Sequence, residues 1–308
     1  MLVSVIIPVY DGELYLREAL ASVLAQTHRD LDVVVIDDGS RDGSAAVALS
    51  TGDHRVRVLQ QPNAGVAAAR NAGIAAARGG VLAFLDADDV WASHKLATQL
   101  PRLTEGVGAV GALMVYLGSS GPLPAAAGEV ADDQQERIAA GLLMPFPPSS
   151  LLMPTALVRE LGGFDEKLSL SVAPVDDLDL LARVAQRQRV VTVPRTLGWY
   201  RIHESAASFG RFHDMSRATR FVVARLAARR AGGDLEWDEW EDPAPPGWQH
   251  RRSERAHWLY RRAGLRVASG QRLAGAATAA AAAALSPGYV VPRLLRQRRA
   301  ASHQAGAA

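Results

Sequence analysis

Gly80-Val-Leu-Ala-Phe-Leu-Asp-Ala-Asp-Asp-Val-Trp91 joins a short apolar run to three closely spaced aspartates. Residues 81–85 are too few and too uniformly apolar for a surface helix, and they predict a strand buried on both faces, as in a parallel sheet. Ligands of open α/β sheets bind beyond the carboxyl ends of the strands, so Asp86, Asp88 and Asp89 are expected at a ligand site. The Asp-x-Asp pattern offers oxygen ligands to Mg²⁺ or Mn²⁺, and such a cation in turn holds a diphosphate.

The same acidic triplet also has a purely structural interpretation. Aspartates that follow a strand often shape a turn or cap the next helix, and Asp88 or Asp89 could cap a helix that begins near Ser93. The triplet alone leaves both interpretations open, so the neighbouring elements have to decide between them.

The residues before this stretch alternate between strand patterns and helix patterns. Strands are predicted over 4–10, 31–36 and 56–60, and helices over 13–26, 41–49 and 66–77. Strands separated by helices require right-handed crossovers. The pattern therefore predicts an α/β fold with a Rossmann-like, mainly parallel sheet flanked by helices.

The following residues give a looser pattern. We predict a strand over 109–117, loops over 118–128 and 141–150, a short helix up to Leu161, a helix that opens at Val175, and a strand pair over 190–193 and 197–202.

The chain is predicted to change character near residue 210. Residues 1–210 carry 17 basic and 24 acidic side chains, whereas residues 211–308 carry 17 and 8. We expect a domain over 1–210 and a basic, Ala/Arg-rich helical region over 211–308, with helices over 212–230 and a helical hairpin over 253–285. A basic amphipathic segment over 289–299 could meet an anionic membrane or pack as a helical cap, and residues 300–308 are expected to be disordered.

Bulk composition excludes several classes of protein. Apolar residues make up 48% and charged residues 21% of the chain, which are globular values, and the absence of cysteine excludes disulfides and thiolate metal sites. The first residues lack the features of a signal peptide, and no long apolar run suits a membrane helix. We expect a cytoplasmic protein, at most peripheral at the inner membrane face, and no nucleic-acid partner for its acidic N-terminal part.

Two common nucleotide-binding signatures are missing from the sequence. No G-x-G-x-x-G follows the first strand and no G-x-x-x-x-G-K-[ST] occurs, so dinucleotide and P-loop chemistry are not favoured. The strand ends carry carboxylates instead, at Asp37 and Asp38 and at the Asp86 cluster. A carboxylate accepts well from the ring N–H of uracil or thymine and from ribose hydroxyls, but it suits phosphate only with a metal between them.

Several segments together resemble the family 2 glycosyltransferases of GT-A fold. These are Val5-Ile-Ile-Pro-Val-Tyr10, Gln26-Thr27, Val35-Ile-Asp-Asp-Gly-Ser40 with Asp42, Asn63-Ala-Gly65, Ala69-Arg-Asn-Ala-Gly73 and Phe84-Leu-Asp-Ala-Asp-Asp89. The resemblance resumes at Gly162-Gly-Phe-Asp-Glu166, at Asp176-Asp177 with Asp179, and at Trp199-Tyr-Arg-Ile-His-Glu204. Each segment is weak evidence by itself, whereas their order and spacing together are specific.

The resemblance implies a nucleotide-sugar site at the strand ends. Pro8, Tyr10 and Asp38 would line the base pocket, with Tyr10 stacking on the base and Asp38 meeting its ring N–H. Arg70 would reach the pyrophosphate, since its planar fork suits anionic oxygens, and Asp86 would bind the ribose. From the residues alone, Tyr10 could equally pack a strand end and Arg70 could be a solvated helix residue.

The resemblance also implies a metal and a catalytic base. Asp88 and His203 would hold Mg²⁺ or Mn²⁺ with Asp89 in support, and Asp177 would be the general base. The family usually has Glu-Asp where this chain has Asp176-Asp177, which leaves the acceptor-side role of the first residue open. Without the resemblance, the acids at the helix start could simply cap it, and a lone histidine after a strand could be only a polar strand end.

We therefore expect an inverting, metal-assisted glycosyltransferase that uses a UDP- or dTDP-linked sugar, with a glycan, lipid-linked or other hydroxyl acceptor, as in cell-wall or polysaccharide biosynthesis. One alternative is a sugar nucleotidyltransferase, although the Pro8-Val-Tyr-Asp-Gly12 turn lacks the Gly- and Arg-rich loop of that class. Another is a non-catalytic protein that only binds nucleotide sugars.

Overall fold

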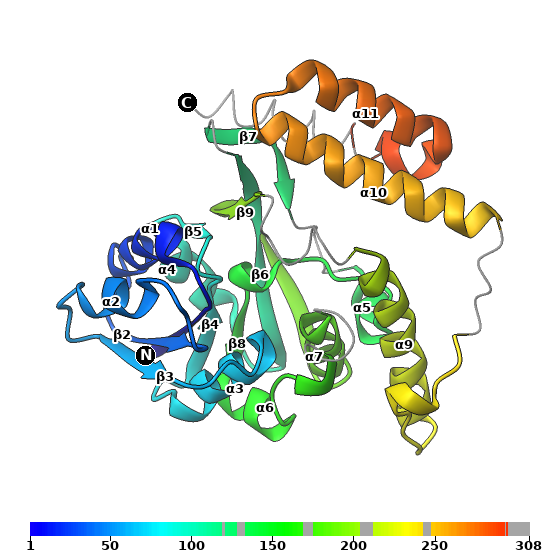
Figure 1. Ribbon diagram of the computed structural model, residues 1–308. Coiled ribbons are helices and arrows are strands. Elements are labelled where there is room, and N and C mark those ends of the chain that lie inside the picture. The colour runs from blue at the N-terminus through cyan, green and yellow to red at the C-terminus, as the bar shows by residue number, and fades with distance from the viewer. Residues whose placement is uncertain are drawn as a thin grey trace.

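The computed structural model describes residues 1–118, 121–127, 133–168, 175–203, 212–242, 248–292 and 294. A nine-stranded sheet runs through the molecule, and helices cover both of its faces (Figure 1). Along its main path the strand order is β3-β2-β1-β4-β8-β6-β9-β5, and β7 pairs with β6 outside that path.

The first four strands of this order are parallel, as the sequence predicts. They are β3 (Val56–Gln60), β2 (Leu31–Asp37), β1 (Val3–Val9) and β4 (Val81–Phe84). Helices α1 (Glu13–Leu24), α2 (Ser44–Leu49) and α3 (Val66–Ala76) connect them. Strands β1, β2 and β4 are buried along their whole length, which is why they read as continuous apolar runs.

The second part of the sheet is mixed. Strand β8 (Leu152–Pro154) runs antiparallel to β4 and to β6 (Val107–Gly118), while β9 (Arg189–Arg201) runs parallel to β6. The short β5 (Val90–Trp91) pairs antiparallel with β9, and β7 (Gly121–Ala127) pairs antiparallel with β6. The sheet is therefore mainly, not wholly, parallel.

Two local predictions were wrong. The loop predicted over 118–128 contains β7, because strand pairing with β6 overrides a Gly- and Pro-rich composition. A strand pair was predicted over 190–193 and 197–202, but the two segments form the single strand β9. Val193 pairs with Ala112 and Thr196 pairs with Leu113, so Pro194 lies in a bulge where it needs no pairing partner on β6. The alternative in which Asp88 or Asp89 caps the next helix is not observed, since that helix, α4 (Lys95–Gln99), has His94 at its N-cap and no side-chain cap bond.

Two hydrophobic cores fill the two faces of the sheet. One packs α1, α2 and α4 (Lys95–Gln99) on one face, and the other packs α3, α5 (Gln135–Ala139), α6 (Thr155–Glu160) and α7 (Asp176–Ala185) on the opposite face. Gly73 lets α3 approach the sheet closely, since a Cβ there would lie 2.4 Å from Ile6 Cγ2. Helix α3, which carries Arg70, is thereby held against β1 and β2.

The C-terminal helices form a third group. Helix α9 (Phe212–Arg230) packs on α7 in a core that includes Phe221, Leu226 and Trp240, and α10 (Trp248–Ala268) and α11 (Arg272–Leu285) form the predicted hairpin (Figure 1). Residues 287–292 are again helical, so the amphipathic segment expected over 289–299 begins as a helix two residues earlier, whereas the predicted disorder over 300–308 falls outside the described residues. In the described part of the chain, every helix is too short or too polar to span a bilayer.

Candidate donor and catalytic site

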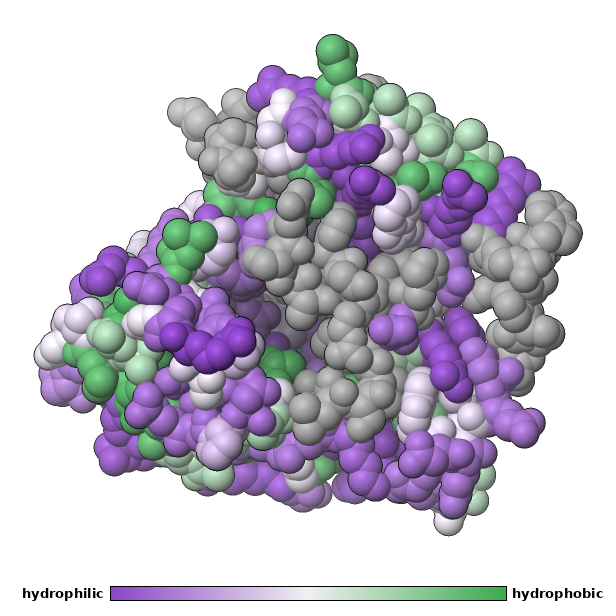
Figure 2. Space-filling model, in the orientation of Figure 1, coloured by the Kyte–Doolittle hydropathy of each residue, from purple (hydrophilic) through white to green (hydrophobic). Residues whose placement is uncertain are grey.

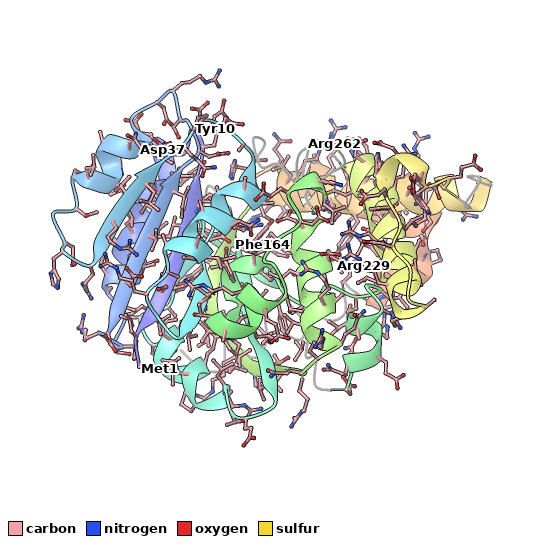
Figure 3. The ribbon with its side chains drawn as sticks, turned by 90° about the horizontal axis from the view of Figure 1, so that it is seen from below. Met1, Tyr10, Asp37, Phe164, Arg229 and Arg262 are labelled. Carbon is pink, nitrogen blue, oxygen red and sulfur yellow. The ribbon has the colours of Figure 1, made fainter. Side chains whose placement is uncertain are left out.

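The predicted base pocket lies where β1 and β2 end. Figure 3 shows Met1 and Tyr10 at opposite ends of β1, with Tyr10 and Asp37 at the same end of the sheet. Pro8 lies two residues beyond the last residue of β1 that pairs with β4. The Tyr10 ring is 46% exposed, and the Arg41 guanidinium lies 5.6 Å from its centroid. A partly exposed aromatic ring at this edge can accept a stacked base.

Asp38 is buried and anchors the loop before α3. Its Oδ1 accepts hydrogen bonds from the Gln61 side chain at 2.7 Å and from the backbone N–H of Ala64 at 2.9 Å. Its Oδ2 accepts one from the N–H of Gly65 at 2.8 Å. A carboxylate has about four acceptor positions, so Oδ2 keeps one for a further donor. Asp38 therefore combines a structural role with one acceptor position left for a further donor.

Arg70 links the end of β4 to the start of α7. Its two terminal nitrogens donate to Asp86 Oδ1 at 2.8 Å and to Asp176 Oδ2 at 2.9 Å, and its guanidinium lies 5.2 Å from the Phe164 ring centroid. Burial opposes the charge of Arg70, but Asp86 and Asp176 together hold its pKa above the usual value. Arg70 is thus a buried bridge between two carboxylates, not the solvated helix residue of the alternative interpretation.

Asp177 is half-buried beside this bridge. Burial and the Asp176 carboxylate raise the pKa of Asp177 to about 7, and Arg70 partly offsets them. One of its oxygens accepts from the N–H of Leu178 at 2.8 Å. Asp177 thus combines partial exposure of the residue with a pKa near neutrality, which suits a general base.

Asp88 and His203 meet at the far end of β9. His203 Nε2 lies 2.8 Å from Asp88 Oδ2, and both side chains are partly exposed. Arg201 holds this turn, since its Nε donates to the Asp88 carbonyl at 2.7 Å and its backbone N–H donates to Asp89 Oδ1 at 2.8 Å. The sequence prediction that Asp88 and His203 come together is consistent with this geometry.

Asp89 lies inside the protein behind Asp88. It is 1% exposed, and burial together with the Asp88 and Asp86 carboxylates raises its pKa well above the usual value. Ser149 Oγ lies 3.0 Å from the backbone nitrogen of Asp86 and connects the same turn to the segment before β8. Asp89 therefore supports the acidic turn from behind and does not face a ligand.

Sequence reasoning missed the organising roles of Arg201 and Ser149. Arg201 stands inside the Trp199–Glu204 segment that carries the resemblance, so its position was visible but its contacts were not. Ser149 lies in a Pro-rich stretch that gave no signal. Both residues act through bonds to segments 60 or more positions away in the chain, which periodicity cannot indicate.

The donor set suits a divalent cation held jointly with a ligand. Within the described residues, no group of three or more His, Cys, Asp or Glu side chains could hold a metal ion. Asp88 and His203 supply one carboxylate oxygen and one imidazole nitrogen, which are suitable ligands for Mn²⁺. Mg²⁺ too is typically bound by one or two carboxylates with substrate phosphates. The chemistry therefore fits a metal that the donor diphosphate would help to bind.

Comparison with known sequences identifies relatives of this chain. Residues 4–147 match the family model described as "Glycosyl transferase family 2". An uncharacterized glycosyltransferase of Nostoc sp. is 34% identical over 221 residues, which cover 66% of this chain and 65% of the relative. Glycosyltransferase GlyA of Streptococcus pneumoniae is 43% identical over 105 residues, 33% of this chain and 15% of GlyA. The matches thus span less than two thirds of these relatives' own lengths.

Comparison with solved structures shows the fold. Residues 1–349 of TarS from S. aureus, in complex with UDP-GlcNAc, superpose with a TM-score of 0.58 at 16% identity, covering 99% of this chain and 92% of that one. The mannosyltransferase PcManGT from Pyrobaculum calidifontis, in complex with GDP-Man and Mn²⁺, gives 0.57 at 20% identity, covering 98% and 86%. The mixed sheet flanked by helices is that of GT-A glycosyltransferases.

The matched relatives are named glycosyltransferases, and this chain shares its fold with solved glycosyltransferase structures. Residues 4–147 of this chain are accordingly a glycosyl transferase family 2 domain. The family recognised from its sequence motifs and the GT-A fold expected from them are both confirmed.

Proposed function

We propose that this protein is an inverting glycosyltransferase, moving a sugar from a UDP- or dTDP-linked donor to an acceptor hydroxyl with Asp177 as the general base. The observation that carries the proposal is the half-buried Asp177 carboxylate beside the Arg70 bridge, with its pKa raised to about 7 by burial and by Asp176. A base with that pKa is largely ionised just above neutral pH and still accepts a proton readily.

In the proposed reaction the acceptor hydroxyl gives its proton to Asp177 while its oxygen attacks the anomeric carbon. The new carbon–oxygen bond forms as the bond to the diphosphate breaks, and the nucleoside diphosphate leaves with that electron pair. A single displacement of this kind inverts the anomeric centre. A retaining double displacement would require a second carboxylate as nucleophile, and Asp176 and Asp179 are both buried in ion pairs.

The donor would lie along the strand ends. Tyr10 stacks on the base beside Pro8, the remaining acceptor position of Asp38 Oδ2 meets the ring N–H, and Asp86 meets the ribose. Both terminal nitrogens of Arg70 already hold carboxylates, so we assign its effect on the pyrophosphate to its buried positive charge. Asp88 and His203 would hold Mg²⁺ or Mn²⁺. When bound, this cation supplies positive charge that stabilises the departing diphosphate.

Asp177→Asn tests the proposal. The substitution removes the base but keeps the shape of the side chain, so we expect the turnover number to fall by about 10²–10⁴-fold. The rise in melting temperature given by UDP with Mn²⁺ should stay the same, because Asp177 does not bind the nucleotide. Turnover within twofold of the unmodified protein, measured as Mn²⁺-dependent hydrolysis or transfer across a panel of nucleotide sugars, would remove Asp177 from this role.

The named relatives are glycosyltransferases, so we do not carry the nucleotidyltransferase alternative further. The same panel separates the two reactions, since a nucleotidyltransferase releases pyrophosphate from a nucleoside triphosphate and a sugar phosphate. A non-catalytic binder would show the UDP-dependent melting shift without any turnover.

We further propose that the α10–α11 hairpin contacts an anionic membrane surface, where a lipid-linked acceptor would be presented. Residues 248–292 carry seven arginines and one acidic residue, Glu254, which lies 3.8 Å from Arg220. Hydrophilic and apolar surface lie side by side on the hairpin (Figure 2), and Leu273 is 89% exposed. Basic side chains next to an apolar face favour the surface of anionic bilayers.

Vesicle sedimentation tests the membrane proposal. The protein should pellet with phosphatidylglycerol vesicles and stay in solution with phosphatidylcholine vesicles, and salt should weaken the binding because it screens the arginines. Leu273→Asp should also reduce binding to the phosphatidylglycerol vesicles, because it replaces an exposed apolar side chain with a negative charge. Equal binding to both vesicle types, or to neither, contradicts the proposal.

A further inference from the structure

Three aspartates lie in the first turn of helix α7, and the middle one differs from the other two in burial and in its hydrogen-bond partners. Asp176 is 1% exposed and accepts from Arg70, while Asp179 is fully buried and accepts from two arginines. Asp177 is half-buried, and its hydrogen bond in the described part of the chain comes from the N–H of Leu178, its own neighbour. Arginine side chains thus hold Asp176 and Asp179 in place, whereas Asp177 forms no ion pair among the described residues and can act as the proposed base.

The clamp on Asp179 comes from two directions. Arg183, one turn further along α7, donates to Asp179 Oδ2 at 2.8 Å and also to the carbonyls of Leu161 and Gly163 at 2.6 and 2.7 Å. Arg225, from the C-terminal helix α9, donates to Asp179 Oδ1 at 2.9 Å. Arg183 therefore ties α7 to the preceding segment, and Arg225 ties α7 to a different part of the chain.

Arg225 also reaches a second carboxylate. Its Nη1 donates to Asp165 Oδ2 at 2.7 Å, its guanidinium lies 5.3 Å from the Phe221 ring centroid, and it is 3% exposed. Asp165 follows Phe164, whose backbone N–H and carbonyl are both bonded to the Asn71 side chain on α3. Arg225 is therefore the point where α9, the first turn of α7 and the segment next to α3 are joined.

We propose that Arg225 is a positioning residue for Asp177, and this inference rests on the function proposed above. Helical residues two positions apart point about 200° away from each other, so the Asp179 anchor lies behind the helix while Asp177 faces the site. Fixing the back of the first turn sets the rotation of α7 and hence the direction of the Asp177 carboxylate. Arg225 touches neither Asp177 nor the donor-binding residues, and it lies outside the matched residues 4–147.

The planar fork of arginine is what this position requires. One guanidinium donates to two carboxylates in fixed directions, whereas a lysine ammonium is a compact charge on a flexible stem. A lysine could keep the charge at Asp179 but not the rigid bridge to Asp165. We therefore expect Arg225→Lys to restore part of what Arg225→Met removes.

The experiment compares Arg225→Met, Arg225→Lys and Asp165→Asn with a control, Arg220→Met. Arg220 lies on the same helix but pairs with Asp242 and Glu254, away from α7. Arg225→Met should lower kcat for Mn²⁺-dependent turnover of the active nucleotide sugar by about 10–100-fold, because a displaced base loses its alignment. The donor KM should change by less than about twofold, since ground-state binding is intact. Arg225→Lys and Asp165→Asn should lie between Arg225→Met and the unmodified protein, and Arg220→Met should keep full kcat.

Hydrogen exchange of the α7 amides gives a second readout that needs no activity. The N–H of Asp179 bonds to the carbonyl of Val175, and exchange in this first turn should be faster in Arg225→Met than in Arg220→Met. Unchanged kcat in a folded Arg225→Met protein overturns the positioning role, and so does a loss of kcat in Arg220→Met as large as that in Arg225→Met. An unmodified protein without any turnover contradicts the proposed function instead, and exchange in α7 then decides whether Arg225 clamps the helix.

Discussion

Asp38 at the end of β2 and the two outer acids at the start of α7 are held by different means. Asp38 is fixed by backbone N–H groups and a glutamine within 27 residues of it in the chain. Asp176 and Asp179 are fixed by arginines, two of which come from α3 and α9, 106 and 46 residues away. In the donor half, the loop around Asp38 is therefore held by local bonds, whereas the start of α7, here called the base half, is held by long-range ion pairs.

This difference has a consequence for how the two halves tolerate change. A carboxylate held by backbone donors keeps its partners when one side chain is replaced. A buried carboxylate held by a single arginine loses its compensation when that arginine is removed, and breaking such a pair costs about 3–5 kcal/mol. The start of α7, around the proposed general base, should therefore lose more stability than the loop around Asp38 when one side chain is replaced.

The largest effect is expected at Arg70, which connects the halves. Arg70→Met leaves Asp86 and the buried Asp176 without their common partner, so we expect the free energy of unfolding to fall by about 3–5 kcal/mol. Urea unfolding measures this loss. Donor binding should weaken as well, because the guanidinium also supplies positive charge beside the proposed pyrophosphate position.

Arg57 provides a matched control, because its partner Asp32 lies near the start of β2, at the opposite end of the strand from Asp37. It donates to Asp32 from β3, but Asp32 also accepts from Ser4 at 2.7 Å and from the N–H of Arg78 at 3.0 Å. Arg57→Met should therefore cost less, about 1.5–3 kcal/mol. Equal losses at Arg57 and Arg70 would show that the additional donors to Asp32 do not lessen the cost of removing an arginine.

A smaller effect is expected at His203. His203→Ala removes one of the two proposed metal ligands while leaving Asp88 in place, so the Mn²⁺ concentration that gives half of the UDP-dependent melting shift should rise by at least about tenfold. His54→Ala, at an exposed position before β3, is the control and should leave that concentration unchanged. An unaltered Mn²⁺ dependence in His203→Ala would mean that the imidazole does not bind the cation.

Much of the donor half could be predicted from the sequence. Buried parallel strands read as continuous apolar runs and their ends as Asp-rich turns, so the strands around Asp38 and Asp86 were located within one or two residues. The Asp88–His203 contact was anticipated only through family resemblance, because the two residues lie 115 positions apart.

The base half was less predictable. The i,i+4 pair of Asp179 with Arg183 follows from helical spacing. No local pattern, however, shows that Arg70 turns away from solvent to bridge Asp86 and Asp176, or that Arg225 reaches α7. Such pairs depend on which helices pack together, and β7 and β9 were misread for a similar reason, since pairing with β6 decides their form.

The most direct test of the account is the pH dependence of kcat/KM for Mn²⁺-dependent turnover of the active nucleotide sugar. Burial and Asp176 raise the pKa of Asp177 to about 7, above its value in the unfolded chain, so the base is protonated and inactive at lower pH. We predict that kcat/KM falls about tenfold per pH unit below pH 7 and is level above it. In Asp177→Asn, the residual kcat/KM should no longer fall as the pH drops below 7. A profile that stays level down to pH 5, or an Asp177→Asn profile with the same fall, would contradict the assignment of Asp177 as the base.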